Sequence, residues 1–175
     1  HNSALSRYTF ESEECDCIRF TAEDDIFWKN THDRIVAAAS SENVLIWISL
    51  PCTGGCYYNS TNRRRSLREE ISDDNQQHNF LHMLKCVDVV VKSVLQRGFK
   101  PIIAMELPTT NEYWLTTEVQ SFEADYKMER YYTCGCEFGL KALFGKDKGK
   151  LMKKPWLIST SSRIIGADIS RTCSH

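Results

Sequence analysis

The alternation of apolar and polar positions along the chain predicts strands separated by helices. Residues 44–50 (VLIWISL) are almost continuously apolar and rich in β-branched types, which is typical of a strand buried on both faces. Residues 101–107 (PIIAMEL) form a second run of this kind. Three further segments, residues 17–21, 131–140 and 154–162, also have the composition of strands.

Three segments between these strands have a helical pattern, residues 25–39, 63–97 and 111–125. The C-terminal half of the second one carries an apolar stripe that would face a core. This stripe consists of Phe80, Leu84, Val87, Val91, Val94 and Leu95. Gly98 follows it and is a natural C-terminal stop for the helix.

This order of elements predicts an α/β fold with a Rossmann-like, mainly parallel sheet and helices on both of its faces. Only a loop separates the last two strands, so we expect them to pair as a C-terminal antiparallel hairpin at the sheet edge. The chain has 175 residues and shows no internal repeat or linker, which indicates one domain over residues 1–175.

Composition narrows the choice of partners and compartment. The net charge of −1 gives no overall basic field, and no apolar run is long enough to span a bilayer, so we expect no membrane association. Among eight cysteines, Cys15 and Cys17, and likewise Cys134 and Cys136, are separated by one residue. We expect the thiols of each pair to point away from each other, which favours a reduced, intracellular chain, cytoplasmic or nuclear.

Two predicted strands carry a potentially reactive side chain at or just beyond their carboxyl ends. Cys52 follows the strand at residues 44–50, and Glu106 stands near the end of the strand at residues 101–107. Ligands of open α/β sheets bind beyond the carboxyl ends of strands. A thiol nucleophile beside a proton-donating carboxyl group is a working catalytic pair. The plainer interpretation is a strand-to-turn transition with Cys52 as a small apolar residue.

Three motifs in this order resemble those of the (cytosine-5) DNA and RNA methyltransferases, which belong to class I. They are PCTGGC at residues 51–56, IIAMELP at 102–108, and CEFGL followed by KKPWLIST between residues 136 and 160. The chain looks still closer to methyltransferase-like domains of mobile-element and virus-like polyproteins in protists. The resemblance implies that Cys52 attacks C6 of cytosine, that Glu106 holds the N3 edge of the ring, and that S-adenosylmethionine methylates C5.

The resemblance also implies contacts with DNA or RNA. Thr53, Gly54 and Gly55 would shape the loop after Cys52, and Tyr57 or Tyr58 could stack on an extruded base. Two basic segments could hold phosphates, although the arginines also suit a solvated helix start. The expected substrate-binding residues are Thr53, Gly54, Gly55, Tyr57, Tyr58, Arg63, Arg64, Lys153 and Lys154.

Cofactor and metal binding are less well defined by the sequence. The family binds its cofactor through a first strand and a glycine-rich turn, but no glycine precedes Gly54 here. We therefore expect that the first strand is missing and that the cofactor pocket is incomplete. The start at His1 is typical of a processed product or of one piece of a longer polypeptide. The alternative is a non-catalytic module that binds nucleic acid or other segments of a polyprotein. No metal is predicted, but the sequence leaves zinc open at Cys134, Cys136, Cys173 and His175.

Overall fold

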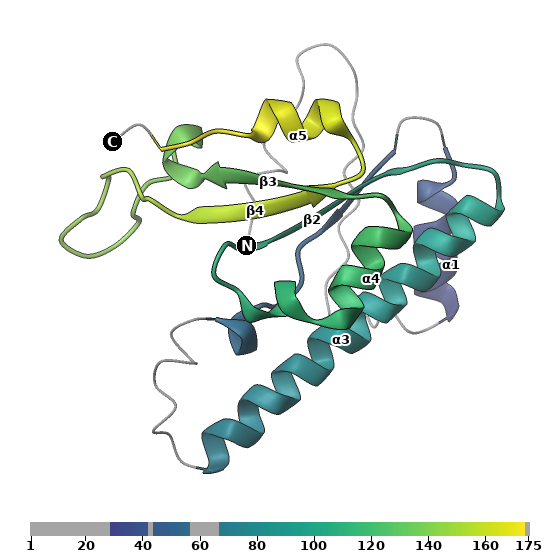
Figure 1. Cartoon of the computed structure of the whole chain (residues 1–175), viewed down its shortest axis with the longest axis horizontal. Helices are drawn as coiled ribbons and strands as arrows, with labels where there is room; N and C mark the ends of the chain where they lie inside the picture. The colour runs from purple at the N-terminus through teal and green to yellow at the C-terminus, as the bar shows by residue number, and fades with distance from the viewer. Residues whose placement is uncertain (1–28, 42–43, 57–66, 174–175) are drawn as a thin grey trace.

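The computed structural model of the chain describes residues 29–41, 44–56 and 67–173 (Figure 1). The sheet in this part has four strands: β1 (Leu45–Ile48), β2 (Ile102–Pro108), β3 (Glu129–Cys134) and β4 (Pro155–Thr160). Its α-helices are α1 (Lys29–Ala39), α3 (Leu67–Gln96), α4 (Thr117–Asp125) and α5 (Arg163–Ile169). Short 3₁₀ turns are η3 (Thr53–Gly55), η4 (Glu112–Leu115) and η5 (Gly135–Phe138). The predicted α/β class is therefore confirmed, while the strand expected at residues 17–21 lies outside the described residues.

The sheet is mixed, with strand order β1-β2-β4-β3. β1 runs parallel to β2, with Trp47 opposite Ala104. β4 is antiparallel to both of its neighbours, β2 and β3. The predicted antiparallel pairing of the last two strands, β3 and β4, is thus confirmed. Of these two strands, β3 lies at an edge of the sheet and β4 does not. β4 is inserted between β2 and β3, where Ser159 and Thr160 are almost fully buried.

The long helix α3 anchors the core against one side of the sheet. Figure 1 shows it running diagonally across the molecule, with α1 and α4 beside it. Its apolar stripe meets β2 in one cluster, whose buried members include Phe80, Leu84, Val91, Ile103, Met105 and Leu107. A second cluster joins Val36 and Ala39 of α1 to Val90 and Val94 of α3. Within the described residues, no helix is both long and apolar enough to cross a membrane.

Capping side chains explain where the helical segment at residues 111–125 departs from the prediction. Asn111 caps the 3₁₀ turn η4, because its side chain accepts a hydrogen bond from the Tyr113 N–H at 2.9 Å. Thr116 then caps α4 by accepting from the Val119 N–H at 3.4 Å. One predicted helix is therefore a turn followed by a shorter helix.

Helix α5 was not predicted from the sequence. Ser162 caps it by accepting a hydrogen bond from the Ile165 N–H at 3.3 Å. The helix packs on β3, with Gly166 so close to the Tyr131 ring that an added Cβ would overlap it. Only a glycine permits this approach, so Gly166 fixes the position of α5 on the sheet.

Candidate functional site

The ends of β1 and β2 lie side by side, as the sequence predicted. Since the two strands are parallel neighbours, their carboxyl ends meet at one edge of the sheet. Just after β1, the Ser49 hydroxyl donates a hydrogen bond of 2.8 Å to Glu106 Oε1 on β2. This contact ties the chain that leads to Cys52 to the strand that carries Glu106.

Asn111 holds the loop that follows Cys52. Its side-chain Nδ2 donates to the Cys52 carbonyl oxygen at 2.8 Å, and the same oxygen accepts from the Gly55 N–H at 3.2 Å. Asn111 is 3% exposed, so this polar contact is well shielded from water. A Cβ at position 55 would overlap both Asn111 and the Tyr113 ring, so only glycine allows the loop to pack this closely against them.

Asn111 is a site residue that sequence reasoning missed. The available signal was a capping-type residue in the short turn after the strand that carries Glu106. That signal indicates a turn, but it does not indicate which backbone group the side chain reaches.

The electrostatic environment of Cys52 favours its neutral thiol. Partial burial is the main cause that raises the pKa of Cys52 above its usual value, and the charges of Glu106 and Cys56 raise it further. The Lys154 ammonium acts in the opposite direction and lowers the pKa of Cys52. The Cys52 thiol, the Glu106 carboxylate and the Lys154 ammonium therefore interact electrostatically, although they come from three separate segments.

Lys154 reaches this site because it precedes β4. Its ammonium lies 4.8 Å from the centre of the Trp156 ring, and Trp156 pairs with Pro108 at the end of β2.

Of the other expected substrate-binding residues, Thr53 and Lys153 are exposed and Gly54 is half-buried. Tyr57, Tyr58, Arg63 and Arg64 lie outside the described residues, so their predicted roles stay predictions.

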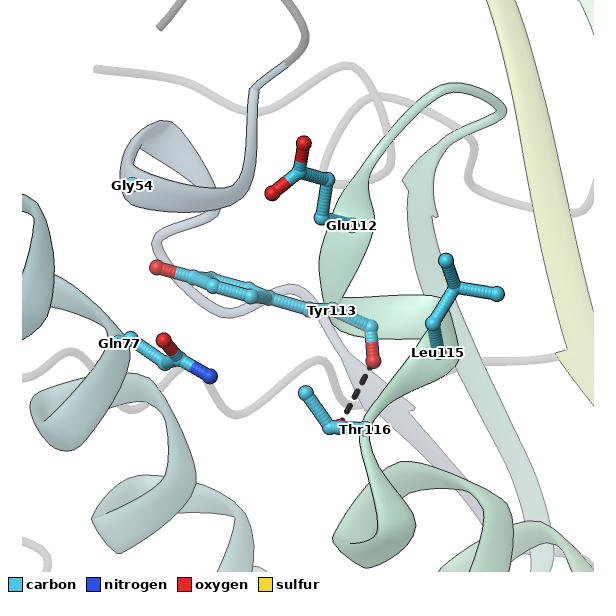
Figure 2. Close-up of a pocket in the computed structure, with 6 residues that line it drawn as sticks. All are labelled: Gly54, Gln77, Glu112, Tyr113, Leu115 and Thr116. Carbon is cyan, nitrogen blue, oxygen red and sulfur yellow. Dashed lines mark hydrogen bonds between the residues drawn. The ribbon is translucent and has the colours of Figure 1, made fainter. Parts of the chain in front are cut away.

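A surface hollow lies next to the Cys52 loop, on the side of α3 and η4. Figure 2 shows Tyr113 extending between Gln77 and Gly54, with the Thr116 hydroxyl donating to the Tyr113 carbonyl oxygen at 2.8 Å. The lining residues are Gly54, Gln77, Glu112, Tyr113, Leu115 and Thr116. Neither Cys52 nor Glu106 lines it, so this hollow is distinct from the cleft expected between those two side chains.

The cysteine pair at the end of β3 departs from the prediction. We expected Cys134 and Cys136 to point away from each other, but their Sγ atoms lie 3.2 Å apart. The reason is that the strand ends at Cys134 and the chain turns into η5 at Gly135. Within the described residues, no disulfide bond joins any of the six cysteines, which are Cys52, Cys56, Cys86, Cys134, Cys136 and Cys173.

Comparisons of the chain with protein-family models, with curated proteins and with solved structures gave no match. The function is therefore argued from the geometry of the site.

Proposed function

We propose that the chain is an S-adenosylmethionine-dependent methyltransferase-like domain that acts on cytosine in DNA or RNA. Cys52 is the nucleophile and Glu106 is the proton donor. One observation carries the proposal: two adjacent parallel strands end at one edge of the sheet, where Ser49, three residues before Cys52, donates a hydrogen bond to Glu106. This is the arrangement that the motif resemblance implies.

The chemistry of this pair follows from the cytosine ring. The Cys52 thiolate forms a bond from sulfur to C6, the C5–C6 π electrons shift to C4–C5, and the C4–N3 π electrons move onto N3. Glu106, in its acid form, gives its proton to N3, so the negative charge passes from sulfur to the carboxylate and the ring stays neutral. C5 becomes electron-rich as a result and can accept an electrophile.

Lys154 assists the attack of the Cys52 thiolate on C6. Its ammonium lowers the pKa of Cys52, which increases the fraction of reactive thiolate. An ionised Glu106 has the opposite effect, because its charge raises the pKa of Cys52.

The strand and glycine-rich turn that the resemblance assigns to S-adenosylmethionine are not among the described residues. The cofactor would supply the methyl group that C5 accepts, and in the resembled family it lies on a glycine-rich turn. No methyl-transfer step is derived for these residues.

The Rossmann-like architecture forms part of the proposal. α3 packs on Ile103 and Met105 of β2, whereas α5 packs on Tyr131 of β3. Tyr131 pairs with Ile158, which in turn pairs with Glu106, and neighbouring residues along a strand point to opposite faces. This alternation supports helices on both faces, and the reversed strand β4 corresponds to the final hairpin strand implied by the resemblance.

A lysine-rich segment supports nucleic acid as the substrate. Between η5 and β4, exposed ammonium groups cluster in the sequence next to the strand that carries Trp156. The cluster consists of Lys146, Lys148, Lys150, Lys153 and Lys154. Exposed lysines neutralise phosphates without reading sequence, so this segment suits either DNA or RNA. An intracellular location belongs to the same proposal.

One observation favours a second candidate, a non-catalytic module that binds nucleic acid or another segment of a polyprotein. Burial raises the pKa of Cys52, and a partly buried neutral thiol is a weak nucleophile. In that case the lysine-rich segment would bind its partner while Cys52 only packs against the core.

A covalent trap distinguishes the two candidates. The chain is incubated with S-adenosylmethionine and oligonucleotides of DNA or RNA that contain 5-fluorocytosine. After methyl transfer, C5 carries no hydrogen to lose, so the adduct with Cys52 persists and adds the mass of the oligonucleotide.

Where the chain has bound S-adenosylmethionine, we expect the adduct with the wild type, none with Cys52→Ser, and at least about a 10²-fold slower reaction with Glu106→Gln. Cys86→Ser is the matched control and should react as the wild type does. A chain that binds both S-adenosylmethionine and the oligonucleotide but forms no adduct would be the non-catalytic module.

A further inference from the structure

Three cysteine sulfur atoms converge beyond the end of β3, and none of them belongs to the proposed catalytic pair. Cys136 Sγ lies 3.2 Å from Cys134 Sγ and 3.3 Å from Cys173 Sγ. All three sulfur atoms lie within 4.8 Å of one another. Cys134 and Cys136 are buried and Cys173 is partly buried. The three residues are hereafter called the thiol cluster.

The turn η5 brings Cys136 back towards Cys134. Gly135 starts this turn, and a Cβ there would press against Leu140 and against the Trp156 ring. The turn ends at Gly139, whose φ of 71° is in the left-handed region that glycine adopts readily. Two glycines therefore permit the tight path that places both thiols on the same side.

The third thiol arrives from a distant part of the chain. Cys173 is 37 residues beyond Cys136, after helix α5. A parallel bridge between Thr133 and Arg171 aligns this segment with β3. The Arg171 guanidinium also lies 4.9 Å from the centre of the Phe138 ring in η5. Two contacts besides the sulfur atoms thus hold the C-terminal segment at the cluster.

The spacing of the sulfur atoms matches a metal site. Zinc binds thiolates at about 2.3 Å in a tetrahedral arrangement, which sets neighbouring sulfur atoms about 3.8 Å apart. The separations in the thiol cluster, from 3.2 Å up to at most 4.8 Å, bracket that value. Small side-chain rotations would bring three sulfur atoms to one ion without moving the backbone.

We propose that Cys134, Cys136 and Cys173 bind a zinc ion. Soft thiolate ligands select zinc over the hard ions Mg²⁺ and Ca²⁺, and sites rich in cysteine are mostly structural. Each thiol gives its proton to the solvent when it binds, and no electron is transferred. The ion would fasten the C-terminal segment to the end of β3 and so hold α5 on the sheet.

Metal content tests this proposal directly. The full chain is purified under reducing conditions, stripped with a chelator, loaded with Zn²⁺ and passed through a desalting column. Elemental analysis should give close to one zinc per chain for the wild type and for Cys86→Ser, a matched control on α3. Cys136→Ser and Cys173→Ser should retain less than about a tenth of this amount.

Cobalt supplies a second readout that depends on the ligands. Co²⁺ bound by several thiolates gives a strong near-ultraviolet charge-transfer band, which should form with the wild type and be lost in Cys173→Ser. Because Cys173 is only partly buried, this variant should keep its fold by circular dichroism even if Cys136→Ser does not.

Three results would each overturn the zinc site. They are a folded, reduced wild-type chain that retains no zinc, a folded Cys173→Ser chain that retains all of it, and a Cys136–Cys173 disulfide found by mass spectrometry in the zinc-treated chain.

Discussion

Cys52 is acted on by two neighbouring charges of opposite sign, and this makes its reactivity adjustable. Glu106 raises the pKa of the thiol and Lys154 lowers it, while burial raises it regardless of either charge. Since only the thiolate reacts, the rate of alkylation at neutral pH should be low and should rise with pH beyond the usual range of a free cysteine.

Charge substitutions should move this rate in opposite directions. At a fixed pH of about 8, Glu106→Gln should speed alkylation of Cys52 by iodoacetamide several-fold, because it removes the charge that raises the pKa of Cys52. Lys154→Met should slow it, because the pKa of Cys52 then rises further. Peptide mass spectrometry over a pH series measures the rate for each cysteine separately.

Cys86 serves as a control within the same molecule. Its pKa is raised by burial alone, so neither substitution should change its alkylation rate. Equal rates for Cys52 in all three chains would show that Glu106 and Lys154 do not act on it.

The sequence indicated part of this site. Cys52 and Glu106 could be found because each stands beside a recognisable apolar strand. Asn111 could not be found, because its contact with the Cys52 carbonyl depends on how the turn η4 folds. The position of Lys154 beside Cys52 depends on the insertion of β4 next to β2, which no local pattern encodes.

An ion pair joins α4 to the edge strand β3. Arg130 donates to both oxygens of Glu123, at 2.7 and 2.6 Å, and also to the Trp114 carbonyl oxygen at 2.9 Å. Its guanidinium lies 4.6 Å from the centre of the Trp114 ring. Glu123 is only 8% exposed, so this carboxylate depends on Arg130 for its hydrogen bonds.

Arg130→Met should therefore lower the free energy of unfolding by about 2 kcal/mol, since it leaves a shielded carboxylate without a charged partner. Arg163→Met is the matched control. Arg163 donates to Glu129 on the same strand, but its side chain is 83% exposed and the pair lies in water. Urea denaturation should show a clear loss for the first variant and almost none for the second. Equal losses would contradict a special role for the Glu123–Arg130 pair.

Long, periodic elements were predictable, and short ones were not. The apolar stripe of α3 correctly predicted that Phe80, Leu84, Val91 and Val94 lie in the core, because a helix of 30 residues repeats its pattern many times. Leu95 was placed wrongly and is 40% exposed, whereas Val90 is buried. Helix α5 has seven residues, too few for a period to stand out.

The order of the strands determines what the whole molecule can do. Because β1 and β2 are adjacent and parallel, Cys52 and Glu106 reach one edge, and because β4 is reversed beside β2, its first residues bring Lys154 to the same edge. The sequence predicted the parallel pair and the antiparallel pair. It did not predict that β4 lies inside the sheet, since that depends on competition between strands for the free side of β2.

The proposed activity depends most directly on the addition of Cys52 to C6 of cytosine with the help of Glu106. This addition makes C5 basic, so C5 takes up deuterium from D₂O, and loss of the original hydrogen on reversal leaves a labelled base. The exchange needs no methyl donor, so its result does not depend on the binding of S-adenosylmethionine.

Mass spectrometry of digested cytosine oligonucleotides should show Cys52-dependent deuterium at C5 with the wild-type chain. Cys52→Ser should give only the background rate, and Glu106→Gln a rate about 10²-fold or more below the wild type. A folded chain that binds the oligonucleotide and gives no exchange above the Cys52→Ser background would contradict the claim.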